Sequence, residues 1–180
     1  MKRLLRNIVN IVGLFVLLFI ASAPLTTHAA TYTWDGGGVD NNWNTCANWS
    51  SDTCPLTTDS VVFSATSTKN ADINVDITVS SFSINSGYTG VIAPLASQLI
   101  TINSTFVQSS GTFTASAATT SMAGDSTFTG GTFNHNSGTV YFTGTGSRTI
   151  TPNATVFQNV TFDTSGASGA TITTSIASDM

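Results

Sequence analysis

From residue 72 onward, isolated large apolar side chains alternate with small polar ones in short runs bounded by Gly, Ser and Asn. An alternation of period two in Val, Ile and Phe is typical of a β-strand with one buried face. Helix signals are absent there, since Glu is missing, Leu is rare and no run has 3.6-residue spacing. The pattern therefore predicts an all-β fold. The clearest predicted strands are 73–79, 82–84, 99–102 and 140–142.

The same region repeats a short phrase. Ser110–Phe113 reads S-G-T-F, and Gly130–Phe133 reads G-G-T-F, about 20 residues further on. One short coil cannot bury its own apolar face, but stacked coils align Phe on Phe in a continuous core. The Gly before Thr-Phe permits the tight corner between strands. The spacing favours a β-solenoid of about five coils. A Greek-key β-sandwich also uses short strands and Gly-rich turns, so it stays open as the alternative.

The first 30 residues have the layout of a leader. Lys2, Arg3 and Arg6 precede an apolar run over 8–23, and small residues follow up to Ala30. This order is typical of a secretory signal peptide. The apolar run is short for a membrane span of about 20 residues, so cleavage near Ala30 is favoured over an uncleaved anchor. We therefore expect residues 1–30 to be a signal peptide and the rest to be exported, without a membrane span.

Two regions follow the leader. Residues 31–71 hold all three Trp and both cysteines, whereas 72–180 have the monotonous repetitive composition. In an oxidising compartment Cys46 and Cys54 are expected to form a disulfide. Closing so short a loop stabilises the fold by about 2–3 kcal/mol. We expect one continuous body with an N-terminal cap.

The charge of the chain limits the classes of partner that it could bind. The chain has nine acidic residues, all Asp, and five Lys or Arg. Three of those cations lie in the leader, which leaves only Lys69 and Arg148 beyond it. Nucleic acids and anionic lipids are poor partners because both need a basic face. Other proteins and neutral glycans at the cell surface fit better.

The segment 34–63 carries the most specific pattern. It reads W-D-G-G-G, then two further Trp with the second in N-W, then Pro55, then D-S-V-V-F. It resembles the W-x-G-G-G…W…N-W…P…D-x-V-x-F segment at the start of β-helical regions in bacterial extracellular proteins, including autotransporter-like and adhesin-like surface proteins. The resemblance implies a single-stranded right-handed parallel β-helix, a capping role for this segment and a place at the cell surface.

The aromatic residues of this segment have two interpretations. Trp34, Trp43 and Trp49 could form a platform for a sugar ring. Spaced Trp in a capping segment more often seal the open end of a solenoid core. We favour the seal.

No cofactor is predicted, although calcium deserves a test. Asp35, Asp40 and Asp59, with Asn41 and Asn42, could supply oxygen ligands. Their spacing misses the EF-hand pattern, and Asp and Asn are also ordinary turn formers.

Catalytic chemistry has little support, so no enzyme is predicted. Asp125 and Asp163 are the only carboxylates between Asp76 and Asp179, and nothing in the sequence pairs them as a glycosidase requires.

Two basic residues are also weak candidates. His135 has no nucleophile motif nearby. Arg148 is expected to face solvent at a strand edge, where a cation discourages aggregation. Likewise, Asp72 and Asp76 lie an even number of residues apart and would share a face on one strand, but we favour two exposed carboxylates at turn edges.

The sequence thus predicts an exported, non-catalytic structural or adhesion protein at the cell surface or outer envelope. The alternative is a secreted carbohydrate-binding module that uses Trp34, Trp43 and Trp49.

Overall fold

A computed structural model describes residues 29–163 and 172–174. The expected signal peptide lies almost entirely outside these residues. The described strands form three sheets, in which every strand pairing is parallel. The seven-stranded sheet holds β1 (Thr31–Thr33), β2 (Ser60–Phe63), β5 (Phe82–Ile84), β8 (Phe106–Gln108), β11 (Ser126–Phe128), β14 (Arg148–Thr151) and β16 (Ile172–Thr174). The five-stranded sheet holds β4 (Ile77–Val79), β7 (Ile100–Ile102), β10 (Thr119–Met122), β13 (Thr139–Phe142) and β15 (Asn159–Phe162). The four-stranded sheet holds β3 (Ala71–Ile73), β6 (Val91–Pro94), β9 (Thr112–Thr114) and β12 (Thr132–Asn134).

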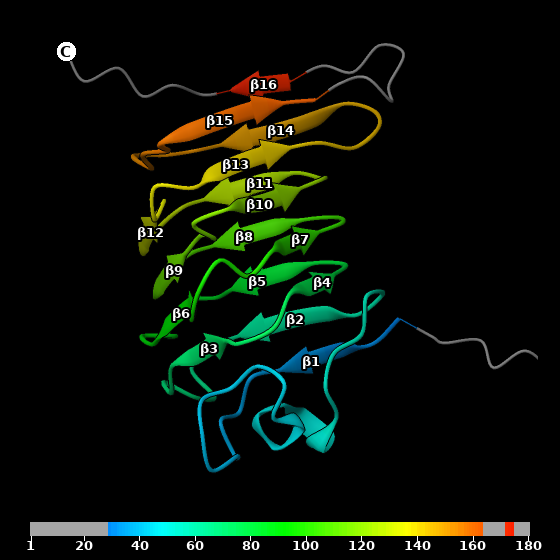
Figure 1. Cartoon of the computed structure of the whole chain (residues 1–180), viewed down its shortest axis with the longest axis vertical. Helices are drawn as coiled ribbons and strands as arrows, with labels where there is room; N and C mark the ends of the chain where they lie inside the picture. The colour runs from blue at the N-terminus through cyan, green and yellow to red at the C-terminus, as the bar shows by residue number, and fades with distance from the viewer. Residues whose placement is uncertain (1–28, 164–171, 175–180) are drawn as a thin grey trace, which may run out of the picture.

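The chain visits the three sheets in turn and rises by one strand at each visit. A coil runs from the four-stranded to the five-stranded and then to the seven-stranded sheet, as β3–β4–β5 does, and about five coils stack along the long axis (Figure 1). This is a parallel β-helix, as predicted. A Greek-key sandwich is built from antiparallel strands, so that alternative is excluded.

The core lies between the three sheets. In most strands from β2 to β14 one set of alternate residues is buried, because successive side chains point to opposite faces. Stacking brings like residues together, with Phe82 paired to Phe106 and Phe113 paired to Phe133. The ring centroids of Phe113 and Phe133 lie 5.9 Å apart in a stacked arrangement. The predicted Phe-on-Phe core is therefore confirmed.

Two of the repeated phrases contain the expected glycine corner. Gly111 and Gly131 have φ values of +62° and +76°, in the left-handed region that favours glycine. A Cβ on Gly131 would lie 2.4 Å from the backbone oxygen of Ser110 in the coil below. Glycine there serves both the turn and the close approach of successive coils.

The predicted continuous strand 73–79 is wrong, because β3 and β4 belong to different sheets and a corner separates them. Within that corner Val75 is 37% exposed, and Asp76 accepts a hydrogen bond from the N–H of Leu99 in the next coil. Asp72 is in β3 and Asp76 is outside both strands, so they do not share one strand face. The alternation of apolar and polar residues continues through this corner, so the sequence pattern does not show where the corner lies.

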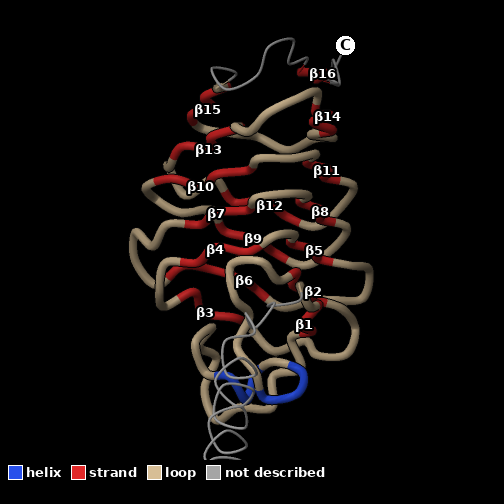
Figure 2. Tube along the Cα trace, turned by 90° about the vertical axis from the view of Figure 1, so that its right-hand side faces the viewer, coloured by secondary structure: helices blue, strands red, loops and turns tan. Residues whose placement is uncertain are grey.

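Non-strand structure gathers at the N-terminal end. β1 and β2 already belong to the seven-stranded sheet, so the segment outside the stacked strands is 34–59, here called the cap segment. It contains two short 3₁₀ helices, η1 (Cys46–Asn48) and η2 (Ser50–Asp52). Figure 2 shows them below β1 and β3, at one end of the stack. The cap segment closes that end of the core.

Candidate functional site

All three Trp side chains lie in the core at the capped end. Their exposed fractions are 0% for Trp34, 4% for Trp43 and 0% for Trp49. The ring of Trp49 makes edge contacts with Trp34 at 5.1 Å and with Trp43 at 4.6 Å. Trp34 stacks on Phe63 at 5.7 Å, which continues the aromatic column of the solenoid. Rings buried in this way seal the core and leave no open face for a sugar.

The polar edges of two indoles are satisfied within the cap. Trp34 donates its ring N–H to the carbonyl of Lys69 at 3.1 Å, and Trp49 donates to the carbonyl of Trp43 at 2.8 Å. A buried indole N–H needs such a partner. These two hydrogen bonds fix the orientation of the indole rings of Trp34 and Trp49.

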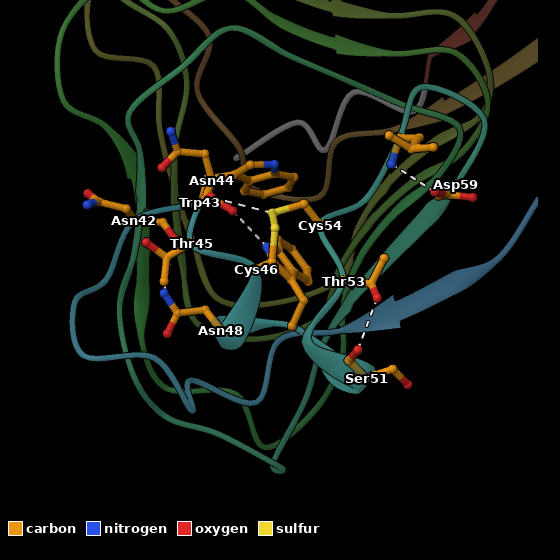
Figure 3. The surroundings of a disulfide bond; sticks show 12 residues. Asn42, Trp43, Asn44, Thr45, Cys46, Asn48, Ser51, Thr53, Cys54 and Asp59 are labelled. Atoms are coloured by element: carbon orange, nitrogen blue, oxygen red, sulfur yellow. Dashed lines mark hydrogen bonds between the residues drawn. A yellow bond between two sulfur atoms is a disulfide. The ribbon is translucent and has the colours of Figure 1, made fainter.

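The expected disulfide joins Cys46 and Cys54, with an S–S distance of 2.06 Å. Figure 3 shows it between η1 and the strand-free segment that leads to Asp59. Cys46 is exposed, whereas Cys54 packs against the core. The disulfide therefore links the exposed part of the cap segment around Cys46 to the core beside Trp34, Trp43 and Trp49, here called the Trp cluster.

Lys69 links the cap segment to the first coil. Its ammonium donates to the carbonyls of Gly36 at 3.0 Å and Gly38 at 2.6 Å, and to Asn48 Oδ1 at 3.1 Å. Asn48 is fully buried. Two of the three Gly of the W-D-G-G-G phrase thus present carbonyls to a lysine more than 30 residues away. Sequence reasoning missed this role, although Lys69 is one of only two cations beyond the leader.

The backbone of Lys69 belongs to the same junction. Its carbonyl accepts a hydrogen bond from the hydroxyl of Tyr88 at 2.8 Å. Burial raises the pKa of Tyr88 well above its usual range, so its hydroxyl stays a donor. Residues 65–70 contain no strand or helix, and this polar loop supplies the lysine that links the cap segment to the first coil.

Asp40 organises the turn before η1. Its two carboxylate oxygens accept hydrogen bonds from the N–H and side-chain amide of Asn42, from the Thr45 hydroxyl and from the Asn48 amide. These bonds, above all that from Thr45, lower the pKa of Asp40 below 3.8. The carboxylate holds the turn.

The other calcium candidates point elsewhere. Asp35 accepts from the N–H of Gly37 at 3.0 Å. Buried Asp59 accepts from the N–H groups of Ala30 and Leu56, both at 2.8 Å. Asn42 lies beside Asp40, while Asn41 gives its carbonyl to the N–H of Asp72. Within the described ranges no group of three or more His, Cys, Asp or Glu side chains could hold a metal ion.

The candidate catalytic residues also have local partners. Asp125 accepts from the N–H of Thr149 at 2.7 Å. Asp163 accepts from the hydroxyl of Tyr141, which raises the pKa of that tyrosine. His135 accepts from the N–H of Ser137 at 3.0 Å through Nδ1. None of these contacts brings two of the three candidates together.

The expectation that Arg148 faces solvent is wrong, since only 3% of the residue is exposed. It occupies a buried position of β14, and its guanidinium donates to the carbonyls of Thr143, Gly144 and Gly146 in the preceding turn. A turn with several free carbonyls at the core edge gives an inward-facing cation its partners. Its Nε–H has no hydrogen-bond partner among the described residues.

The outer face of the seven-stranded sheet carries a regular row of small side chains. Thr33, Val62, Ser83, Val107, Thr127 and Thr151 are paired in register from one strand to the next. We call this row the outer ladder. All its members are half-buried and none is ionisable. Neighbouring strands lie about 4.8 Å apart, so the ladder is a closely spaced, uncharged row.

In comparisons with known proteins, no family model matches the chain, and neither does any curated protein or solved structure. In the part of the chain that the structure describes, no helix is long and apolar enough to cross a membrane.

Proposed function

We propose that the chain is an exported, non-catalytic structural or adhesion protein of the cell surface. The outer ladder is the observation that carries this proposal. Six small, uncharged side chains in register on a parallel sheet can contact an extended surface at many points. A cleft with converging catalytic groups, which an enzyme needs, has no counterpart among the candidate residues.

The rigidity of the body supports the same role. Hydroxyl pairs bridge successive coils beside the ladder, as Thr105 does with Ser81 and Thr129 with Ser109, both at 3.1 Å. The strand-to-strand pairing and the stacked core bind each coil to its neighbours. Such a body keeps its outer face in one shape.

The surface chemistry favours a neutral partner. Lys69 and Arg148 are occupied by carbonyl partners, so neither offers a cation for anionic polymers. Neutral glycans, or other proteins of the cell surface, are the proposed contacts.

Location and intact mass in the natural cells test the proposal. We expect a product without the leader that fractionates with the cell envelope. A freely diffusing product found only in the medium would contradict a structural role at the surface.

Beads coated with the protein test the face itself. Beads should adhere to neutral polysaccharide surfaces, and Val107→Lys should reduce adhesion by disrupting the outer ladder. Thr101→Lys is the matched control, because Thr101 is half-buried in the five-stranded sheet, on another face. Equal loss with both variants would contradict a specific role for the ladder.

A further inference from the structure

The five-stranded sheet has a free edge at the capped end. β4 is its first strand, whereas the seven-stranded sheet continues down to β1. The four-stranded sheet is extended below β3 by backbone hydrogen bonds between Asp72 and the segment 41–43. Among the described strands at this end, β1 and β4 each have a strand partner on one side only, and on its other side β1 donates the N–H of Thr33 to the hydroxyl of Ser50 in the cap segment.

The backbone of Thr78 is directed toward that free side. Ile77 donates its N–H to Leu99 and Val79 accepts from Asn103, so both residues turn their peptide groups toward the next coil. Peptide groups of consecutive residues in a parallel strand point to opposite sides. The N–H and C=O of Thr78 therefore point away from β7, and no described residue bonds to them.

A cavity of about 240 Å³ lies along this free side. It separates β4 and the corner before it from the segment 54–57, and we call it the β4 groove. Its apolar lining includes Trp43, Pro55, Leu56, Val75 and Ile77. Ligand pockets of small molecules usually measure about 300–1,000 Å³, so this groove is sized for a side chain or two.

Exposed apolar residues continue from the groove to the next coil. The described residues contain three leucines, and all are exposed: Leu56 by 59%, Leu95 by 61% and Leu99 by 46%. Leu95 and Leu99 stack above the corner that holds Val75, because the N–H of Leu95 donates to the carbonyl of Ile73 and the N–H of Leu99 donates to the carboxylate of Asp76. The core itself uses Phe, Ile, Val and Trp.

The charge of the groove indicates which charge the partner segment should carry. Asp76 is the one ionisable group in its lining, since Cys54 is in the disulfide. A partner segment with a Lys or Arg beside its apolar residues would compensate the negative charge of this carboxylate.

A second copy of the chain fits less well. A stable dimer buries about 800 Å² on each partner, which a groove and four apolar side chains do not supply. It would also bring two Asp76 carboxylates near each other.

We propose that the β4 groove binds one extended segment of a partner protein that alternates apolar and basic residues. The segment adds to β4 as a strand, with its backbone bonded to Thr78, an apolar side chain in the groove and a basic one near Asp76. Strand addition uses main-chain hydrogen bonds for affinity and pockets for specificity. This site lies on a different face from the outer ladder, so either can fail alone.

Synthetic peptides test the site on the full exported chain in its oxidised form. The probes are a fluorescent peptide that alternates Val and Lys, the same peptide with Glu for Lys, and the Lys peptide with methylated backbone nitrogens. Fluorescence anisotropy should show binding of the first and at least about tenfold weaker binding of the other two. Equal binding of the Lys and Glu peptides, or none at all, would overturn the proposal.

Variants locate the binding. Leu56→Ser combined with Val75→Ser should weaken the Lys peptide about tenfold, and Asp76→Asn should narrow its advantage over the Glu peptide. Both apolar residues are exposed, so the fold should survive, which far-ultraviolet circular dichroism checks. Val39→Ser is the matched control, because Val39 is fully exposed in the cap segment and outside the groove. Unchanged binding in the double variant would overturn the site, as would a dimer that Leu56→Ser dissociates.

Discussion

The core is covered differently at the capped end and in the last described strand of the five-stranded sheet. At the N-terminal end three indoles close it, and none is more than 4% exposed. In the last described strand of the five-stranded sheet, Val160 and Phe162 are 39% and 46% exposed. Yet they pair with Val140 and Phe142, which are each 1% exposed. The alternation decides which way a side chain points, and the layer above it decides whether it is buried.

At the N-terminal end, the cap segment takes the place that a further coil would occupy. A coil would add strands that bond to β1, β3 and β4. The cap segment instead supplies a Trp cluster, a disulfide and a lysine clamp, and it leaves the free side of β4 open. Each of these devices can be removed singly.

The largest expected effect comes from the Trp cluster. Trp49→Ala should lower the free energy of unfolding by about 3–5 kcal/mol, because it leaves a cavity between Trp34, Trp43 and Phe63. Urea denaturation followed by circular dichroism measures it. Phe162→Ala is the matched change at the other end and should cost less than about 1 kcal/mol, because that ring is already half-exposed. Equal losses would mean that both ends are sealed alike.

The disulfide should come next. Replacing Cys46 and Cys54 by Ser should lower the free energy of unfolding by about 2–3 kcal/mol, since the eight-residue separation gives a short loop. Thermal unfolding with and without a reductant measures it. Reductant should destabilise the natural chain and leave the double variant unchanged. Insensitivity of the natural chain would place the closure of this end in the Trp cluster alone.

Much of the solenoid could be predicted because its strands are repetitive. The alternation identified 82–84 and 140–142, and the S-G-T-F phrase gave the spacing at which Phe113 and Phe133 pair. The corner at 74–76 could not be predicted, because it preserves the alternation on both sides. The local sequence pattern predicts which way a side chain points, but it does not predict which sheet its strand joins.

The cap was harder to predict since its contacts join distant residues. Lys69 meets the carbonyls of Gly36 and Gly38 only once β2 and the following loop are in place. Arg148 looked like a solvent-facing cation because its carbonyl partners carry no sequence signal. The groove beside β4 depends on where one sheet stops, which composition does not encode.

The lysine clamp offers a smaller change at the capped end. Lys69→Met should lower the free energy of unfolding by about 1–3 kcal/mol, because the carbonyls of Gly36 and Gly38 lose their ammonium donor and the amide oxygen of Asn48 keeps only the N–H of Gly38. Chemical denaturation measures it. Thr68→Met is the control, since the neighbouring Thr68 is exposed. If both variants lose the same stability, the ammonium contributes nothing specific to the cap.

The smallest expected effect is a pH dependence confined to the cap. Hydrogen bonds from Thr45, Asn42 and Asn48 lower the pKa of Asp40 below 3.8 in the folded chain. A lowered pKa adds stability at pH values above 3.8, and that stability is lost as the pH falls through the folded-state pKa. The difference in unfolding midpoint between the natural chain and Asp40→Asn should therefore be present near neutral pH and disappear in strong acid. Trp fluorescence measures the midpoint at the capped end. A difference that persists unchanged in acid would mean that Asp40 acts through its shape and not through its charge, which would leave the Trp cluster, the disulfide and Lys69 to distinguish the two ends.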